Sequence, residues 1–386
     1  MKHLLAWAAL LPTLSFTSMS CADGKSPMAF LSADSTVVEQ RDTTRHLTLV
    51  FAGDLMQHKP QITAAKSGEG YDYTECFQYI KPQIEYADIA VANFETTLAG
   101  PPYSGFPCFS APDDFLRDVK ATGFDVLLTA NNHVCDKGKR GIERTIAQMD
   151  SLHIPHLGSY VSAQTRAKEY PLLVEKNGFR LVFLNYTYAT NGIPVPQGNI
   201  VNVIDRQQMA RDIQRAKQMQ PDVIIAFMHW GVEYALHQNK EQEELADWLF
   251  AQGVDHIIGG HPHVVQPMEI RTDAKGQKHA LAYSLGNFVS NQFKDNTVGG
   301  MLVHMSLEKD STTRMTDCDY SLYYVTRPGG SGHKQHRVYD VNTPDNVLSA
   351  SERALRDKYV SSTRALFSKY NKNVSERGTS AKIKAQ

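Results

Sequence analysis

Side chains that bind metal ions occur near the ends of several apolar segments in this 386-residue sequence. The segment "PDVIIAFMHW" contains His229, and Glu233 follows it by four residues. A second apolar segment, "VDHIIGG", leads into His261 and His263, which form an H-x-H arrangement. Imidazole and carboxylate groups are ligands for Mn²⁺, Zn²⁺ and Fe²⁺. A single histidine is more often a structural residue of the core or surface than a metal ligand. Two histidines directly after one buried strand, however, favour a metal site.

Polar residues with oxygen or nitrogen ligands take the same position in three further segments. These are Asp54 in "LTLVFAGD", Asn93 and Glu95 in "ADIAVANFE", and Asn131, Asn132 and His133 in "GFDVLLTANNH". Each of them alone could be a helix cap or a polar turn residue. Together they offer the mixed set of carboxylate, imidazole and amide-oxygen groups that a divalent ion prefers.

One histidine has a carboxylate close to it in sequence. Asp136 follows His133 by three residues, and a carboxylate can hold an imidazole in one tautomer and stabilise its charged form. His133 is therefore a candidate for acting on the substrate, with a polar turn as the alternative. His58 and Glu233 are as readily structural as functional. Gly259, next to Gly260, would let the backbone approach the site closely.

The elements that must position these residues alternate along the chain. Apolar runs alternate with segments of helical spacing, which predicts an α/β layered domain. The runs are continuously apolar, so both faces of each sheet should be covered. Ligand sites of such sheets gather outside the carboxyl ends of the strands. We therefore expect one crevice with a two-metal centre, whose ions would lie about 3.5–4 Å apart.

Further elements can be assigned from local patterns. "YPLLVEKNGFRLVFLNYTY" predicts a hairpin with Asn177-Gly178 as its turn. Helical spacing predicts helices in "APDDFLRDVKATG", "KGKRGIERTIAQMDSLHI", "DRQQMARDIQRAKQMQ" and "KEQEELADWLFAQG", the last closed by Gly253. "GGMLVHMSLEKD" and "CDYSLYYVTRPG" predict a β hairpin, and a helix follows Pro344. We expect one domain over residues 46–310 and a small C-terminal appendage over 311–386.

The N-terminus has the pattern of an export signal. In residues 1–21, "MKH" supplies positive charge, "LLAWAALLPTLSF" is apolar but too short to span a bilayer, and "TSMSCA" offers small residues for cleavage. Cys21 is either the lipidated first residue of a mature lipoprotein or part of an ordinary cleavage site. Both alternatives place the mature chain outside the cytoplasm, in the cell envelope or periplasm, with residues 22–45 as a linker.

Cysteine use and charge narrow the class of protein. Four cysteines beyond Cys21 would allow two disulfides with three possible connectivities, and none has the CxxC spacing of a cysteine zinc site. The 40 Lys and Arg residues balance 41 Asp and Glu residues. This balance gives no basic surface for nucleic acid or an anionic membrane, so we expect membrane contact only through a lipid anchor.

The motifs "FAGDLM", "ANFETTL", "TANNHVCDKG", "MHWGVEY", "GGHPHVVQP" and "YSLGNFV" occur in this order over residues 47–292. Their sequence and order resemble those of CapA-type poly-γ-glutamate capsule biosynthesis proteins, a group similar to the calcineurin-like metallophosphoesterase superfamily. The resemblance implies a four-layer αββα sandwich with its site along the rim between two sheets. It also implies two divalent metal ions, an anionic cell-surface polymer or a phosphorylated substrate, and capsule synthase or export partners.

The resemblance further implies a role for each motif residue. Asp54 matches the first metal aspartate, Glu95 a carboxylate that can bridge both metals, and His133 the histidine that protonates the leaving group. The remaining implied ligands are Asn132, His229, His261 and His263. The implied outer contacts to ligands or substrate are His58, Asn93, Asn131, Glu233 and Asn287, with Asp136 beside His133.

Two motif positions differ from the superfamily pattern. Met56 occupies the place of the histidine in its Asp-x-His motif, and "ANFE" replaces a motif that carries aspartate after glycine. Because Met56 lacks an imidazole, one metal position would be weaker, lost or completed by His58. The leading hypothesis is an exported, metal-dependent, hydrolase-like protein acting in synthesis, release or anchoring of poly-γ-glutamate or another capsular polymer. The alternatives are a non-catalytic envelope protein that binds or guides an anionic polymer, and a periplasmic phosphoesterase.

Overall fold

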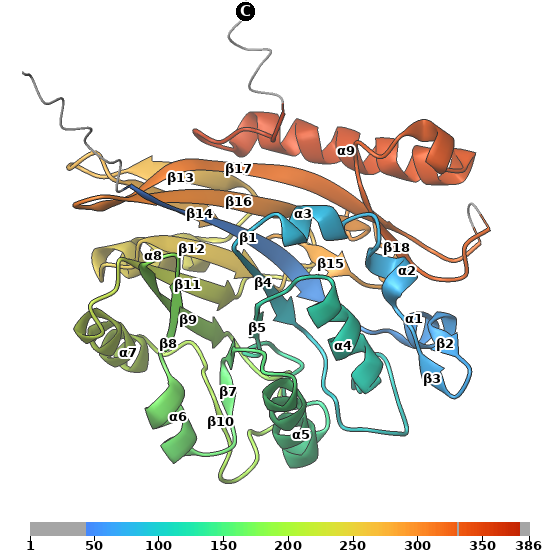
Figure 1. Ribbon diagram of the computed structural model, residues 1–386, viewed down its shortest axis with the longest axis horizontal. Coiled ribbons are helices and arrows are strands. Elements are labelled where there is room, and N and C mark those ends of the chain that lie inside the picture. Colours follow the sequence, from blue (N-terminus) through green and yellow to red (C-terminus); the bar gives the residue numbers. More distant parts are fainter. Residues whose placement is uncertain (1–43, 330–331, 379–386) are drawn as a thin grey trace, which may run out of the picture. The chain divides into compact units, whose positions relative to one another are not determined.

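The structure, a computed structural model, describes residues 44–329 and 332–378. The expected export signal, Cys21 and nearly all of the expected linker lie outside these ranges. The described residues form two large β-sheets that pack face to face, with helices on both outer faces (Figure 1). This arrangement confirms the expected α/β class and the four αββα layers.

The first sheet has the strand order β18-β17-β16-β1-β4-β5-β6, and β15 also pairs with β1. Five of these strands are parallel to one another: β1, β4, β5, β6 and β15. The other three are antiparallel, because β16 pairs with β1, β17 with β16 and β18 with β17 in opposite directions. The strands are β1 (Arg45–Leu55), β4 (Ile89–Phe94), β5 (Val126–Leu128), β6 (His156–Leu157), β15 (Asn287–Val289), β16 (Gly299–Lys309), β17 (Thr313–Thr326) and β18 (Arg337–Asp340).

The second sheet has the order β13-β14-β12-β11-β9-β8. β9, β11, β12 and β14 are parallel, with antiparallel β8 and β13 at the two edges. The expected hairpin joins β8 to β9, and its turn residues Asn177 and Gly178 have φ of 51° and 80°, as a two-residue turn requires. The strands are β8 (Leu172–Lys176), β9 (Phe179–Thr187), β11 (Val223–His229), β12 (His256–Gly260), β13 (Met268–Thr272) and β14 (Lys278–Ala282).

The longer helices cover the outer faces because they present an apolar side to the sheets. Phe115 and Val119 of α4 pack in the cluster on the outer face of the first sheet, and Ile213 of α7 and Leu249 of α8 pack in the cluster of the second. The helices are α1 (Lys59–Ala64), α2 (Thr74–Phe77), α3 (Lys81–Glu85), α4 (Asp113–Ala121), α5 (Gly138–Ser151), α6 (Ala163–Glu169), α7 (Arg206–Gln218), α8 (Lys240–Ala251) and α9 (Ala350–Tyr370). The short paired strands are β2 (Lys66–Ser67) with β3 (Gly70–Tyr71) and β7 (Ser159–Tyr160) with β10 (Ile200–Val201).

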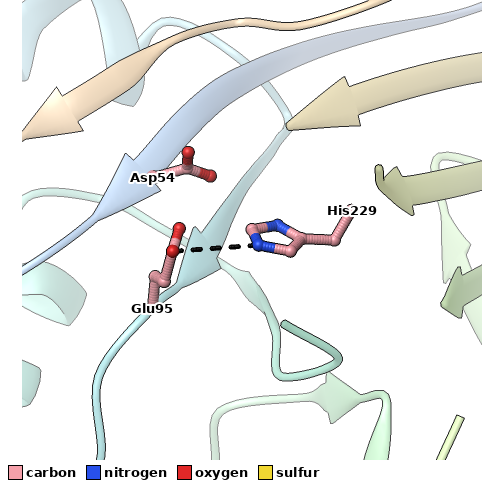
Figure 2. A group of neighbouring side chains, drawn as sticks. All are labelled: Asp54, Glu95 and His229. Carbon is pink, nitrogen blue, oxygen red and sulfur yellow. Dashed lines mark ion pairs between the residues drawn. The ribbon is translucent and has the colours of Figure 1, made fainter. Parts of the chain in front are cut away.

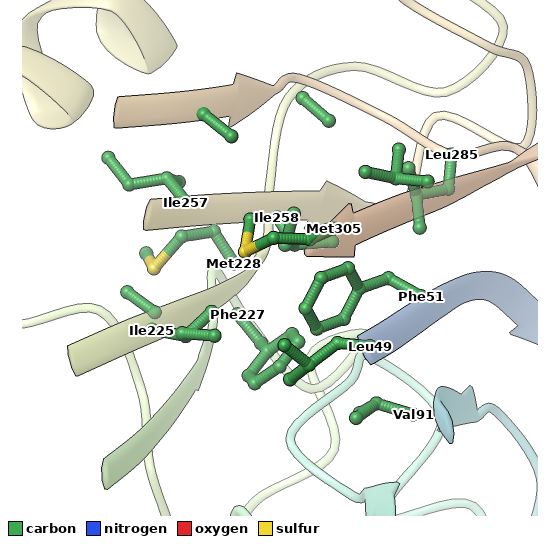
Figure 3. Packing of buried hydrophobic residues seen from close by; sticks show 14 of the residues in the cluster. Leu49, Phe51, Val91, Ile225, Phe227, Met228, Ile257, Ile258, Leu285 and Met305 are labelled. Atoms are coloured by element: carbon green, nitrogen blue, oxygen red, sulfur yellow. The ribbon is translucent and has the colours of Figure 1, made fainter. Parts of the chain in front are cut away.

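The main core lies between the two sheets (Figure 3). The ring of Phe51 in β1 lies 5.8 Å from that of Phe227 in β11, which in turn lies 5.4 Å from Phe183 in β9. Each of these side chains is at most 1% exposed, and full burial of one stabilises the fold by roughly 1.5–3 kcal/mol. This packing fixes the sheets against each other, so the strand ends that carry the polar residues are held at one rim.

The C-terminal part of the chain is integral to the same compact unit. β16 and β17 form the expected hairpin, but β17 and β18 extend the first sheet, and α9 buries Tyr359 and Phe367 against the core. The boundary that we expected at residue 310 therefore does not divide the structure. α9 begins after Ser349, whose side chain and Glu352 form a capping box, and not directly after Pro344.

Two other expectations concern membranes and disulfides. In the part of the chain that the structure describes, no helix has both the length and the apolar composition needed to cross a bilayer. Cys76, Cys108, Cys135 and Cys318 are all free thiols, so the two disulfides that the cysteine count allowed are not formed.

Candidate metal centre

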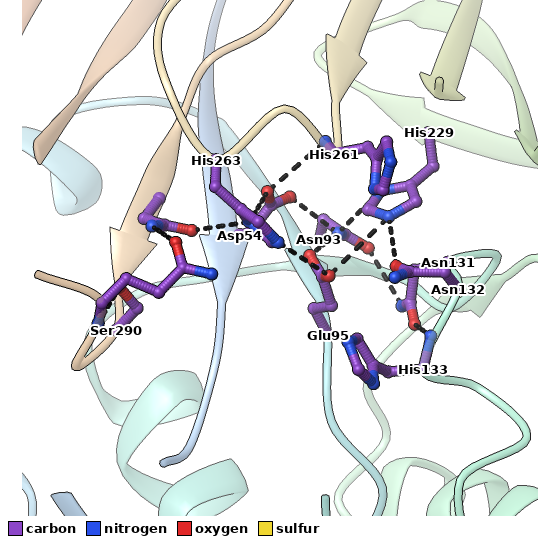
Figure 4. A network of polar contacts seen from close by, with 12 residues as sticks. Asp54, Asn93, Glu95, Asn131, Asn132, His133, His229, His261, His263 and Ser290 are labelled. Carbon is purple, nitrogen blue, oxygen red and sulfur yellow. Dashed lines mark hydrogen bonds and ion pairs between the residues drawn. The ribbon is translucent and has the colours of Figure 1, made fainter. Parts of the chain in front are cut away.

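The sequence-predicted site residues meet where the carboxyl ends of strands from both sheets come together (Figure 4). Asp54 at the end of β1 lies in register with Asn93 of β4 and Asn287 of β15. His229 at the end of β11 is in register with Gly260 of β12, so the two sheets present carboxylates and imidazoles to each other. The convergence that the α/β pattern predicted is present.

Asp54, Glu95 and His229 form the inner group, with ligand atoms that all lie within 4.8 Å of one another (Figure 2). All three are buried. His263 joins them, because its Nε2 lies 3.8 Å from Glu95 Oε1 and its Nδ1 lies 3.4 Å from Asp54 Oδ2. His229 Nε2 is also 3.8 Å from Glu95 Oε1, so one carboxylate oxygen faces two imidazole nitrogens.

These separations suit shared coordination better than direct hydrogen bonding. A distance of 3.8 Å is too long for a hydrogen bond. Ligand atoms bound to one ion at about 2.0–2.2 Å lie roughly 3–4 Å from each other. Among the described residues, Glu95 Oε1 and His261 Nδ1 are buried and have no hydrogen-bond partner. Buried polar atoms of this kind cost free energy unless something binds them, so the residues fit a divalent cation.

The electrostatics of the group support the same interpretation. Burial and the neighbouring charge of Asp54 raise the pKa of Glu95 well above its usual range. Burial alone would raise the pKa of Asp54, but its hydrogen bond with His263 and the charges of His229 and His263 bring it to about 2. Two buried carboxylates this close repel each other, and a bound cation would relieve that repulsion.

Two of the imidazoles, those of His229 and His261, are held in the neutral form that metal ligation requires. Burial, together with the neighbouring imidazoles, lowers the pKa of His229 well below 6.5 and that of His261 to about 3. His261 contacts two aromatic rings, with centroids 4.9 Å from His229 and 4.4 Å from Tyr188. Both histidines are therefore neutral at neutral pH, the form in which an imidazole can bind a metal ion.

Asn287 sets the orientation of His263. The amide nitrogen of Asn287 donates to Gln292 Oε1 at 2.9 Å and to the Thr297 carbonyl at 3.1 Å. Its Oδ1 must then accept from His263 Nδ1, 3.0 Å away. This places a proton of His263 on Nδ1, so in the neutral ring the lone pair lies on Nε2, the nitrogen that faces Glu95. Such outer contacts orient most metal-bound histidines.

Three asparagines complete the polar network. Asn93 donates to Asp54 Oδ1 at 2.8 Å and to Glu95 Oε2 at 3.2 Å. Asn131 donates to Asn93 Oδ1 at 3.2 Å, which fixes the loop after β5 against β4. Asn132 Oδ1 lies 2.7 Å from His229 Nε2, so its amide oxygen points into the centre, as expected of a ligand.

His133 is held beside the centre by a carboxylate. Its Nδ1 lies 2.8 Å from Asp136 Oδ2, which also accepts from the Phe109 backbone N–H at 2.7 Å. The ring of Phe109 packs edge-on to His133, with centroids 4.6 Å apart. Because Nδ1 is used by Asp136, the other ring nitrogen is available to a substrate. The close His133–Asp136 pair agrees with the spacing in the sequence.

The backbone around the H-x-H residues is unusual. His261 and His263 have φ of 98° and 60°, conformations that non-glycine residues rarely adopt and that concentrate at functional sites. A Cβ on Gly259 would lie 2.1 Å from the Tyr283 carbonyl oxygen, and one on Gly260 would lie 3.0 Å from Asp54 Oδ1. Gly259 is therefore needed for the close approach that the sequence predicted, and Gly260 leaves little space beside Asp54.

Two candidates from the sequence lie outside the inner group. His58 Nδ1 is within 3.3 Å of both Gln61 Oε1 and the Asn291 backbone N–H, and His58 is not part of the group formed by Asp54, Glu95 and His229. Burial lowers the pKa of His58 to about 4. Glu233 is exposed, and its negative charge contributes to the raised pKa of Glu95, which places it near the mouth of the site.

Sequence reasoning missed Tyr188 and Phe109. Tyr188 directly follows β9, so the rule that selected the other strand ends would have selected it. Phe109 belongs to the loop between β4 and α4, and no pattern in the sequence marks its contact with His133.

A cavity of about 20 Å³ behind Asp54, Asn93 and His229 has room for about one water molecule.

The fold and the site define a two-sheet α/β protein with a buried carboxylate and imidazole centre suited to divalent cations. The chain belongs to the family described as bacterial capsule synthesis protein PGA_cap, whose model matches residues 48–292. It is 27% identical to the capsule biosynthesis protein CapA of Bacillus anthracis, over 81% of this chain and 76% of the relative. It is 26% identical to the PGA biosynthesis protein CapA of Bacillus subtilis, over 84% of this chain and 82% of the relative.

Solved structures with similar folds include two enzymes. The Haemophilus influenzae NAD nucleotidase has a TM-score of 0.44 and 11% identity, covering 89% of this chain and 59% of the nucleotidase. The calcineurin-like phosphoesterase YfkN from Bacillus subtilis has a TM-score of 0.43 and 14% identity, covering 84% of this chain and 98% of YfkN.

Proposed function

We propose that this chain is an exported, metal-dependent hydrolase that acts in the synthesis, release or anchoring of a capsular polymer, together with capsule synthase or export partners. The family and the two CapA relatives support the capsule role, and their names support poly-γ-glutamate as the polymer. The observation that carries the hydrolase proposal is the buried group of Asp54, Glu95 and His229 beside the His133–Asp136 pair.

The ligands of this centre would be two carboxylates, three imidazoles and an amide oxygen, which suit two divalent ions such as Mn²⁺, Zn²⁺ or Fe²⁺. They are Asp54, Glu95, Asn132, His229, His261 and His263. A bound divalent cation would supply positive charge that stabilises the negative charge developing on a phosphoester or amide centre.

The chain's own residues would handle the proton. His133 would carry a proton on the ring nitrogen that faces the substrate and transfer it to the leaving group. Asp136 would stabilise the charged imidazole through the 2.8 Å contact with Nδ1 and keep the ring in place. Phe109 would hold the ring edge and the Asp136 carboxylate together.

The test of catalysis combines metal analysis with turnover. The purified chain should contain a divalent metal and hydrolyse p-nitrophenyl phosphate or a γ-glutamyl amide. His133→Ala should lower kcat about 10²–10⁴-fold, the usual contribution of a general acid, with metal content unchanged. His46→Ala, a substitution on an exposed strand end, is the control. Equal turnover by wild type and His133→Ala would overturn the assignment of His133.

One observation favours a second candidate function. Met56 stands where the superfamily has a metal-binding histidine, and His58 is not part of the group formed by Asp54, Glu95 and His229. A chain that binds metal and polymer but turns over neither substrate would be a non-catalytic envelope protein that binds or guides the polymer. Turnover of small phosphoesters without any capsule defect in a deletion strain would instead favour a periplasmic phosphoesterase.

The cellular location is part of the proposal. The apolar N-terminus and Cys21 support export and attachment to the envelope through a lipid on that cysteine. Growth with a fatty-acid analogue should label the wild-type chain and leave Cys21→Ser unlabelled. Secretion of unlabelled wild-type chain would favour ordinary signal cleavage.

A further inference from the structure

Two cationic side chains on the same side of the molecule as the metal ligands contact aromatic rings but form no ion pair with any described residue. We propose that Arg206 and Lys294 are anchor points for the anionic groups of a polymer that lies across the centre. The polymer class that they and the neighbouring carboxylates fit is an amide-linked polycarboxylate. The inference rests on the proposed function and adds the residues that select the polymer.

Arg206 lies in a cavity that borders the centre. The cavity has a volume of about 310 Å³, and Tyr188 and Trp230 line it together with Arg206. Tyr188 packs against His261 at 4.4 Å between ring centroids, and Trp230 directly follows His229 in sequence. Tyr188 therefore belongs to the cavity wall and also contacts the implied ligand His261.

The guanidinium of Arg206 is free to bind a ligand. It lies 5.7 Å from the ring centroid of Trp248, and it forms no hydrogen bond or ion pair with any residue that the structure describes. Arginine presents a planar set of donors that matches a carboxylate with two parallel hydrogen bonds. Stacking on Trp248 would orient this set before a ligand arrives.

Lys294 approaches the centre from a different loop. Its Nζ lies 3.5 Å from the ring centroid of Tyr234, whose own ring is 6.1 Å from that of His263. The Tyr234 backbone N–H donates to the Pro262 carbonyl at 2.8 Å, which fixes this ring beside the H-x-H residues. Within the described ranges, Lys294 Nζ has no carboxylate partner. Lys294 is thus a second cation without an ion-pair partner, and only the ring of Tyr234 separates it from His263.

Exposed carboxylates near the two cations narrow the ligand class. Glu241 and Glu244 line the cavity of Arg206, and only Glu244 has a lysine partner, Lys240 at 3.4 Å. Glu233 directly precedes Tyr234, the residue whose ring Lys294 contacts, and burial together with the charge of Glu233 raises the pKa of Tyr234 to about 12. Carboxylates repel a ligand that carries only anionic groups, but they accept hydrogen bonds from amide N–H groups. A polyamide with carboxylate side groups supplies both partners, whereas polyphosphate supplies one.

The test measures polymer binding by variants of exposed residues. Poly-γ-glutamate, a γ-glutamyl dipeptide and polyphosphate of matched charge are titrated into the purified full chain at low and physiological salt. Arg206→Gln and Lys294→Met should each weaken poly-γ-glutamate binding roughly fivefold, the change that about 1 kcal/mol produces. The variant that carries both substitutions should bind poly-γ-glutamate no more tightly than it binds the γ-glutamyl dipeptide. Added salt should reduce the difference between wild type and variants.

Matched controls separate this site from a general effect of charge. Arg211→Gln removes an arginine from the same helix, and Lys278→Met removes a lysine at the start of β14, the end of the strand remote from the centre. Both should bind the polymer like wild type. Unchanged affinity in the double variant, or equal binding of polyphosphate and poly-γ-glutamate, would overturn the inference. Metal content of the same samples tests the proposed function separately, because a metal-free wild type contradicts that proposal alone.

Discussion

At the scale of single residues, the centre depends on side chains that bind no metal themselves. Asn287 illustrates this, because its amide donates to Gln292 and Thr297 and its oxygen is left to accept from His263 Nδ1. The proton is thereby kept away from Nε2, the nitrogen that faces Glu95. Asn93 likewise orients the carboxylate of Asp54, because its amide nitrogen donates to Asp54 Oδ1 at 2.8 Å.

Removing the Asn287 amide should weaken metal binding without unfolding the chain. Asn287→Ala frees the His263 ring to rotate and to adopt the other tautomer, so affinity for Mn²⁺ or Zn²⁺ should fall about 10–100-fold. Isothermal titration of the metal-depleted variant measures this change. Asn199→Ala, which removes another buried amide that bonds Glu143 and Val161, is the control and should bind metal normally. Equal affinity in Asn287→Ala would show that His263 is not oriented in this way.

A buried histidine remote from the centre should make stability depend on pH. Burial, with the charge of His279, lowers the pKa of His256 from 6.5 to about 3, and its Nδ1 accepts from the Ala280 N–H. Between these values the unfolded chain binds more protons than the folded chain, so stability falls on acidification. Between pH 7 and pH 5 this residue should cost about 2 kcal/mol.

His256→Asn tests this dependence, because the Asn oxygen can accept the same Ala280 N–H and does not ionise. Urea unfolding at pH 7 and pH 5 should show a smaller loss of stability in the variant than in wild type. His46→Asn, at a largely exposed histidine, should leave the loss as in wild type. Identical pH dependence in His256→Asn and wild type would mean that His256 can be protonated in the folded chain.

At the scale of elements, the sequence predicted the strand ends well because their signal is local. Three kinds of feature depend only on neighbours in sequence. They are the apolar runs that lead to Asp54 and His229, the Asn177-Gly178 turn, and the helices with apolar residues at helical spacing. Contacts between loops carry no such signal. Phe109 reaches Asp136 from 27 residues away, and β15 lies beside β1 although more than 230 positions separate Asp54 from Asn287.

The glycine pair before His261 should be sensitive to added volume. In Gly259→Ala the new methyl group would meet the Tyr283 carbonyl oxygen at 2.1 Å, and backbone atoms cannot move aside as a flexible side chain can. The free energy of unfolding should fall by about 2 kcal/mol or more. Thermal or urea unfolding measures this. Gly70→Ala, where the nearest atom is 3.9 Å away, should change stability little, and equal stability of the two variants would contradict the close approach.

At the scale of the whole molecule, the expected division at residue 310 failed for a physical reason. The change from α/β alternation to hairpin and helix after that point is typical of an appended unit. Pairing with β17 along the whole of β16 nevertheless places the later strands in the first sheet. The sequence shows that β17 is an apolar strand, but the partner it pairs with and the layer that α9 covers depend on tertiary packing.

Ending the chain at Asp310 should therefore prevent folding. β16 would become an edge strand, paired with β1 on one side and with nothing on the other. The truncation also removes Leu322, Tyr323 and Tyr324, each at most 1% exposed. Burial of three such side chains contributes roughly 1.5–3 kcal/mol each, which is comparable with the total stability of about 5–15 kcal/mol. The truncated chain should be insoluble or unfold without a cooperative transition, as judged by circular dichroism on heating. A chain that ends at Gly378 keeps all the contacts described above and should unfold cooperatively. A soluble monomer of residues 46–310 with a sharp transition and bound metal would show that the metal centre folds independently of β17 and α9.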